Sequence, residues 1–242
     1  MFRCLFRDRL PLAALLLIGT VSPATWAAEK ADFYDPMRQT IEGWTVKVDP
    51  ELLTDENAEE GKRALTALAN HLQRITYIVP KERLADMQKL PIWIELHNEQ
   101  LKNMQYHPSR RWLTSNGHDP RLAKHVHIPR ARNLTARHMW AKHPYVVLHE
   151  LAHAFHDQVL SFDNGPILEA FKNAKEKGHY EEVLLFTGQK VRHYAMTDHK
   201  EYFAEATEAY FGVNDFYPFV RAELKEHDPA LFDLMQEIWG RL

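Results

Sequence analysis

The residues with the clearest chemical potential lie in one short stretch, residues 149–153, which read HELAH. In this H-E-x-x-H pattern two histidines one helical turn apart can bind zinc, and the glutamate beside the first can act as a general base. We expect the stretch to lie in a helix over residues 144–160, because Pro144 suits a first helical position. On that helix the apolar residues share one face, and His149, His153 and His156 share the other. The pattern predicts a metal-binding face backed by a packed core.

A catalytic zinc site needs a third protein ligand, and the spacing of the residues leaves its identity open. Metzincins use a third histidine six residues after the second, but Val159 stands at that position. The carboxylates available downstream are Glu169, Glu201 and Glu205. His156 is either a neighbour of the metal or a polar residue at the edge of a cleft.

The segment 194–205, YAMTDHKEYFAE, resembles the second motif of gluzincin metallopeptidases of the anthrax lethal factor type and of the secreted Pro-Pro endopeptidases. In these families a tyrosine lies seven residues before the glutamate that binds zinc. The resemblance extends over residues 149–211 and carries no substrate preference, since the rest of the chain shows only strands before the metal helix.

The resemblance implies a zincin-like metallopeptidase fold and a Zn2+ ion as cofactor. It implies that His149, His153 and Glu201 bind the ion. It also implies that Glu150 takes a proton from the zinc-bound water and that Tyr194 stabilises the transition state. A second glutamate of the motif, Glu205, would hold one of the ligand histidines from behind.

Simpler roles exist for several of these residues. Asp198 followed by Glu201 has the spacing of a capping box, so Glu201 could close the start of a helix. Glu201, Glu205 and Glu208 share one helix face, which a solvated acidic surface would also produce. We expect Glu208 to lie at the surface. His193 could donate the hydrogen bond that the resemblance assigns to its neighbour Tyr194.

These residues predict an exported zinc metallopeptidase that acts on a peptide or protein substrate. We expect an extended substrate to pair with residues 126–128 as an edge strand. The alternative is an exported zincin-fold protein that binds a metal or ligand without catalysis. Fifteen histidines make zinc buffering conceivable, but they are scattered, and a pure carrier has no use for Glu150.

The elements that must position this chemistry fall into two halves. Alternating apolar residues predict strands at 44–48, 91–97 and 126–128, and an apolar spacing of three and four predicts a helix over 55–75. After Pro129 the pattern is helical nearly to the end, with helix starts at Pro166, Asp198 and Asp228. Strands followed by helices indicate an α+β fold.

Composition and the N-terminus bear on location. The chain has 242 residues and a net charge of −3, so nothing predicts binding to nucleic acid or anionic lipid. Three arginines followed by an apolar run of about a dozen residues predict a signal peptide over residues 1–27, too short for a membrane anchor. The only cysteine, Cys4, lies within it. We expect residues 28–242 to form a single domain that is secreted or periplasmic.

Overall fold

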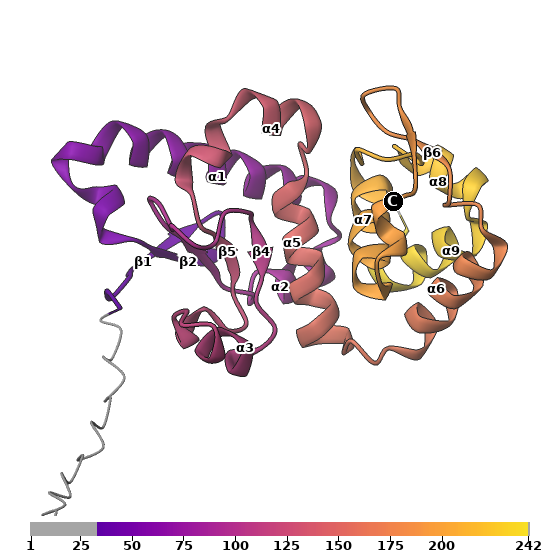
Figure 1. Ribbon diagram of the computed structural model, residues 1–242, viewed down its shortest axis with the longest axis horizontal. Helices are drawn as coiled ribbons and strands as arrows, with labels where there is room; N and C mark the ends of the chain where they lie inside the picture. Colours follow the sequence, from indigo (N-terminus) through magenta and orange to yellow (C-terminus); the bar gives the residue numbers. More distant parts are fainter. Residues whose placement is uncertain (1–32, 242) are drawn as a thin grey trace, which may run out of the picture. The chain divides into compact units, whose positions relative to one another are not determined.

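Residues 33–241 are described by the structure, a computed structural model, and belong to one structural unit (Figure 1). The expected signal peptide, residues 1–27, and its boundary at Ala28 lie outside the described residues. Within the described part of the chain, none of the helices combines the length and the apolar character needed to cross a membrane.

A mixed five-stranded sheet lies in the N-terminal half. In order across the sheet its strands are β1 (Met37–Ile41), β2 (Trp44–Val48), β3 (Ile92–Ile94), β5 (Val126–Ile128) and β4 (Gln105–Tyr106). β1 and β2 form an antiparallel hairpin, and β2, β3 and β5 run parallel. β4 pairs antiparallel with β5 and forms the edge. The three expected strands are confirmed, and β1 and β4 are additions.

Apolar residues cover both faces of this sheet. Helix α1 (Ala58–Ile78) turns Leu68, Leu72 and Ile75 into the main core, which also contains Ile92 and Ile94 of β3. The side chain between them, Trp93, lies in a smaller cluster with Leu113 of α3 (Arg110–Ser115). The alternation along β3 therefore separates two apolar layers, as expected for a strand buried on both faces. The short helix α2 (Lys81–Met87) follows α1.

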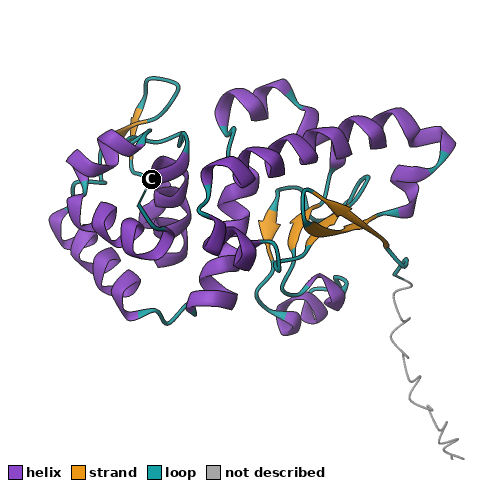
Figure 2. Cartoon of the chain, turned by 180° about the vertical axis from the view of Figure 1, so that it is seen from behind, coloured by secondary structure: helices purple, strands orange, loops and turns teal. Residues whose placement is uncertain are grey.

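Helices make up most of the C-terminal half (Figure 2). They are α4 (Arg137–Lys142), α5 (Val146–Phe155), α6 (Gly165–Lys177), α7 (His199–Phe211), α8 (Arg221–His227) and α9 (Pro229–Trp239). Trp239 of α9 packs on Phe155 at 4.5 Å and on Phe203 at 5.7 Å between ring centroids, so the last helix joins α5 to α7. A small hairpin of β6 (Val183–Leu184) and β7 (Lys190–Val191) interrupts the helices.

Helix α5 is the element that connects the two halves. It contacts β4 and β5 of the sheet, α1, and α7 of the helical half. Its α-helical part ends at Phe155 and one wider turn, a π-helix, continues to Leu160, where we expected a single helix over 144–160. The α+β class is confirmed, with strands in the first half and helices in the second.

Candidate active site

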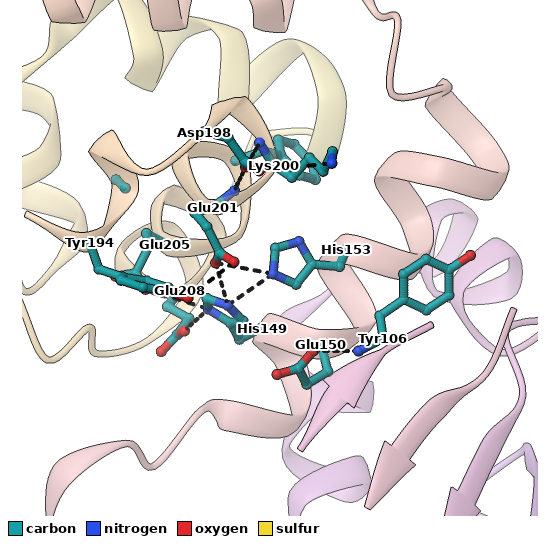
Figure 3. Close-up of polar contacts among 12 residues, drawn as sticks. Tyr106, His149, Glu150, His153, Tyr194, Asp198, Lys200, Glu201, Glu205 and Glu208 are labelled. Carbon is teal, nitrogen blue, oxygen red and sulfur yellow. Dashed lines mark hydrogen bonds and ion pairs between the residues drawn. The ribbon is translucent and has the colours of Figure 1, made fainter. Parts of the chain in front are cut away.

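Helix α5 places its two histidines beside each other at the boundary with α7. Val147, Leu148 and Leu151 are buried on the opposite side of the helix, which fixes its rotation. The Nε2 atoms of His149 and His153 are 3.1 Å apart, and both rings are turned toward α7 (Figure 3). Two residues of the face expected from the sequence, His149 and His153, therefore lie together, whereas His156 is buried away from them.

Helix α7 supplies a carboxylate to the same point. The side chain of Asp198 caps this helix by accepting hydrogen bonds from the backbone N–H groups of Lys200 and Glu201. Glu201 Oε2 lies 3.2 Å from Nε2 of His149 and 3.2 Å from Nε2 of His153. The Glu201 side chain thus points at the histidines and does not close a capping box. Burial raises its pKa, but the bonds to the two histidines outweigh burial and hold it below the ordinary value for glutamate.

The three atoms fit a tetrahedral ion. Two imidazole nitrogens and a carboxylate oxygen are ligands that zinc prefers, and bonds of about 2.0–2.1 Å place neighbouring ligand atoms about 3.3 Å apart. The sides of the triangle formed by His149, His153 and Glu201 are 3.1, 3.2 and 3.2 Å. Within the described chain, possible ligand atoms meet in this way at only one further group, which shares His149.

That second group contains a residue placed wrongly by the sequence pattern. We expected Glu208 at the surface, yet its side chain is fully buried. Glu208 Oε1 lies 2.5 Å from His149 Nδ1 and 2.7 Å from His143 Nε2. These short contacts are hydrogen bonds, so Glu208 holds the ring nitrogen of His149 that faces away from His153. Helical periodicity correctly puts Glu208 on the face of Glu201, but α5 and His143, the residue after α4, cover Glu208.

The role expected for Glu205, support of a ligand histidine, stays a prediction. Its nearest carboxylate oxygen is 3.7 Å from His149 Nδ1, farther than that of Glu208. Burial and the neighbouring Glu208 raise the pKa of Glu205 to about 8. Burial also raises the pKa of Glu208, but His143 and His149 lower it to about 2. The two buried carboxyls therefore differ in charge at neutral pH.

Glu150 lies beside the histidines and is held by the edge strand. Its Oε2 accepts a hydrogen bond of 2.8 Å from the backbone N–H of Tyr106 on β4. The hydroxyl of Tyr106 donates in turn to Asp157, 2.5 Å away in the turn after α5, and Asp157 is paired with Lys124. Figure 3 shows one carboxylate oxygen of Glu150 turned to Tyr106 and the other turned away from it.

Tyr194 and its neighbour His193 have different surroundings. The Tyr194 hydroxyl is 3.4 Å from Glu201 Oε1, and the side chain is 48% exposed. Burial and the charge of Glu201 raise the pKa of Tyr194, so the hydroxyl keeps its proton at neutral pH. His193 is buried, stacks on Phe216 and accepts the N–H of Ala195. Of the two, Tyr194 is the residue whose side chain reaches Glu201 of the histidine–carboxylate triangle.

Two further candidates from the sequence lie away from the histidine–carboxylate triangle. Glu169 is exposed on α6, where Asn173 donates to it. His156 is buried between the rings of Phe162 and Phe203, and its two ring nitrogens have no partner among the described residues.

These groups open onto a cleft of about 610 Å3. Its walls include residues 103–106 before and within β4, Met139 and Lys142 of α4, and the loop residues Asp215 and Phe216. The expected edge strand, residues 126–128, is wrong, because β5 lies between β3 and β4. β4 is the edge beside the cleft. It is two residues long, which no alternation pattern could have revealed.

No family model matches the chain, and no curated protein matches it at a significant level. Among solved structures, the chain is similar to that of a Pro-Pro endopeptidase from Paenibacillus alvei. The two are 17% identical over 83% of this chain and 99% of the other, with a TM-score of 0.44.

Proposed function

We propose that the protein is a zinc-dependent peptidase that hydrolyses peptide bonds in the cleft beside α5. The observation that carries the proposal is the triangle of His149, His153 and Glu201, with Glu150 beside it in the same cleft. A zinc carrier needs the triangle alone. A hydrolase needs the triangle and a base next to it.

Zinc, when bound to these three residues, supplies a Lewis acid that polarises the substrate carbonyl and makes a water molecule more acidic. The chain itself must then move a proton. Glu150 Oε2 is engaged by the N–H of Tyr106, so Oε1 is the oxygen that takes the proton from the attacking water. The same oxygen can deliver that proton to the leaving amine nitrogen.

Tyr194 is the further residue that acts in the proposed reaction, as a hydrogen-bond donor. Its hydroxyl is protonated and half exposed at the rim of the cleft. We assign it to the oxygen on which negative charge develops, an interaction worth about 3 kcal/mol for a single donor of this kind.

The cleft also suggests how a peptide is held. An extended peptide can lie along the outer edge of β4, where the Tyr106 carbonyl can accept a backbone hydrogen bond and direct the peptide past Glu150. β4, and not residues 126–128, is therefore the strand that we propose pairs with the substrate. The partner that we propose is a peptide or protein substrate. The export expected from residues 1–27 stays a prediction.

The decisive experiment compares Glu150→Gln with the native protein on a peptide library, after both are loaded with one equivalent of zinc. Loss of general-base catalysis should reduce turnover by about 10²- to 10⁴-fold, with zinc content unchanged. Glu169→Gln, which alters an exposed glutamate outside the cleft, is the matched control and should retain full activity.

Two results would contradict the proposal. Full activity of Glu150→Gln would exclude this mechanism. Tight binding of one zinc ion without cleavage of any unfolded protein or peptide would favour the alternative, an exported protein that binds a metal without catalysis.

A further inference from the structure

The cleft contains a carboxylate that the proposed chemistry does not use. Asp215 lies in the loop between α7 and α8, and its side chain is only 4% exposed although it lines the cleft. None of residues 33–241 donates a hydrogen bond to its carboxylate. The nearest cation is the Lys142 ammonium, 3.7 Å from Oδ2, which is beyond hydrogen-bond distance.

The backbone around Asp215 is well fixed. The carbonyl oxygen of Asp215 accepts the N–H of Phe186 at 2.8 Å, which ties the loop to the β6–β7 hairpin. The preceding residue, Asn214, donates its side-chain amide to the Glu205 carbonyl at 2.8 Å. Asp215 is therefore held in place by its neighbours and not by bonds of its own carboxylate.

A carboxylate in this position lacks the partners that buried polar groups normally have. Leaving such a group unpaired destabilises the fold, and more strongly when the group is charged. Lys142 offsets little of this, because its side chain is 52% exposed and ion pairs of exposed side chains contribute little. Burial raises the pKa of Asp215, and a cation in contact would lower it.

The surroundings of Asp215 suit a long side chain with a positive end. Met139 lies one turn before Lys142 on α4, Phe216 follows Asp215, and Val146 begins α5. All three line the cleft and offer apolar contact to an aliphatic stem. Among the described residues that line the cleft, Lys142 is the only lysine or arginine. Glu205 is uncharged at neutral pH, and Glu150 and Glu201 serve the proposed chemistry, so Asp215 is the lining carboxylate left to attract a cationic group.

We propose that Asp215, with Met139, Val146 and Phe216, forms a subsite for a lysine or arginine side chain of the substrate. The proposal rests on the peptidase function above and adds a specificity-determining residue to it. The basic group of the substrate contacts the Asp215 carboxylate and displaces Lys142, whose long contact and exposed position allow it to move.

The test is a pair of peptides identical except for one position, lysine in one and the uncharged isostere norleucine in the other. A positional scan of the native protein first identifies the position with the strongest preference for basic residues. The readout is the ratio of kcat/KM for the lysine peptide to that for the norleucine peptide. In Asp215→Asn this ratio should fall at least tenfold.

Two further variants make the comparison specific. Asp163→Asn removes the same charge from an exposed position that does not line the cleft, and its ratio should equal that of the native protein. Lys142→Ala removes the competing ammonium, so its ratio should rise. An unchanged ratio in Asp215→Asn, or a native preference for acidic residues that Lys142→Ala abolishes, would overturn the proposal.

A binding measurement separates this proposal from the peptidase function. The same two peptides are titrated calorimetrically into zinc-loaded Glu150→Gln and into the double variant with Asp215→Asn. Stronger binding of the lysine peptide that depends on Asp215 supports the subsite even if the native protein cleaves nothing. Cleavage by the native protein without any such dependence leaves the peptidase function standing and rejects the subsite.

Discussion

Glu205 and Glu208 show how strongly a single position on a helix decides the role of a carboxylate. The two lie on adjacent turns of α7, and both are buried. Glu208 contacts His149 and His143 at hydrogen-bond distance and is ionised. Glu205 has no such contact and keeps its proton near neutral pH, because two close buried carboxyls cannot both be charged at low cost.

Substitution of these residues should therefore have unequal effects on metal binding. Glu208→Gln removes the charged acceptor that orients the His149 ring, and we expect the zinc dissociation constant to rise about 10- to 100-fold. Glu205→Gln replaces one neutral group by another, so the zinc dissociation constant should change little. Competition with a chromogenic chelator measures both constants. A larger rise of the zinc dissociation constant in Glu205→Gln than in Glu208→Gln would show that Glu205, and not Glu208, supports His149.

At the scale of elements, β4 links the cleft edge to the proposed base. Tyr106 holds Glu150 through its N–H and Asp157 through its hydroxyl, so one residue joins the edge strand to the middle of α5 and to the π-helical turn that follows it. The hydroxyl bond is made to a charged partner, and such bonds contribute about 1.5–3 kcal/mol to stability.

Tyr106→Phe keeps the N–H and removes this hydroxyl. We expect the free energy of unfolding to fall by about 1.5–3 kcal/mol, and kcat to fall while zinc content stays constant, because β4 is less firmly placed beside Glu150. Urea unfolding and peptide hydrolysis measure the two effects. Exposed Tyr77, which is 79% accessible, provides the control Tyr77→Phe. Equal stability of the two variants would show that the Asp157 contact contributes nothing.

The same elements show what the sequence could predict. α5 and α7 were predicted because their signals are local: the periodicity around His149, and the Asp198 cap that the structure shows in place. The burial of Glu208 depends on His143, which lies directly after α4, and helical periodicity cannot specify which neighbour covers a polar face. β4 and the Asp215 loop likewise owe their place in the cleft to long-range pairing.

At the scale of the whole molecule, buried histidines make the fold sensitive to acid. Burial lowers the pKa to about 4 in His71 and His125, and to about 3 in His107, His156 and His193. The unfolded chain takes up these protons near pH 6.5, whereas the folded chain does not. The stability present above pH 6.5 should therefore be lost as the pH falls toward 4, by up to about 1.4 kcal/mol per pH unit for each histidine.

His156→Phe tests this prediction because the ring already lies against Phe162 and Phe203. The free energy of unfolding, measured with urea at pH 7, 6, 5 and 4, should fall less steeply with decreasing pH than in the native protein. The two slopes should differ by about 1.4 kcal/mol per pH unit. His138→Gln, at an exposed position, should leave the slope unchanged. If the stability of His156→Phe and of the native protein fell equally with pH, buried His156 would not be a source of the sensitivity to acid.

The bond from Tyr106 to Glu150 has a consequence for the design of inhibitors. The N–H of Tyr106 points away from β5, on the side where a further strand would pair, and it is already engaged. A peptide laid along β4 therefore meets an acceptor at Tyr106 but no free donor. A peptidomimetic can replace the carbonyl opposite this N–H by a methylene group without losing a hydrogen bond. N-methylation opposite the Tyr106 carbonyl, in contrast, removes one.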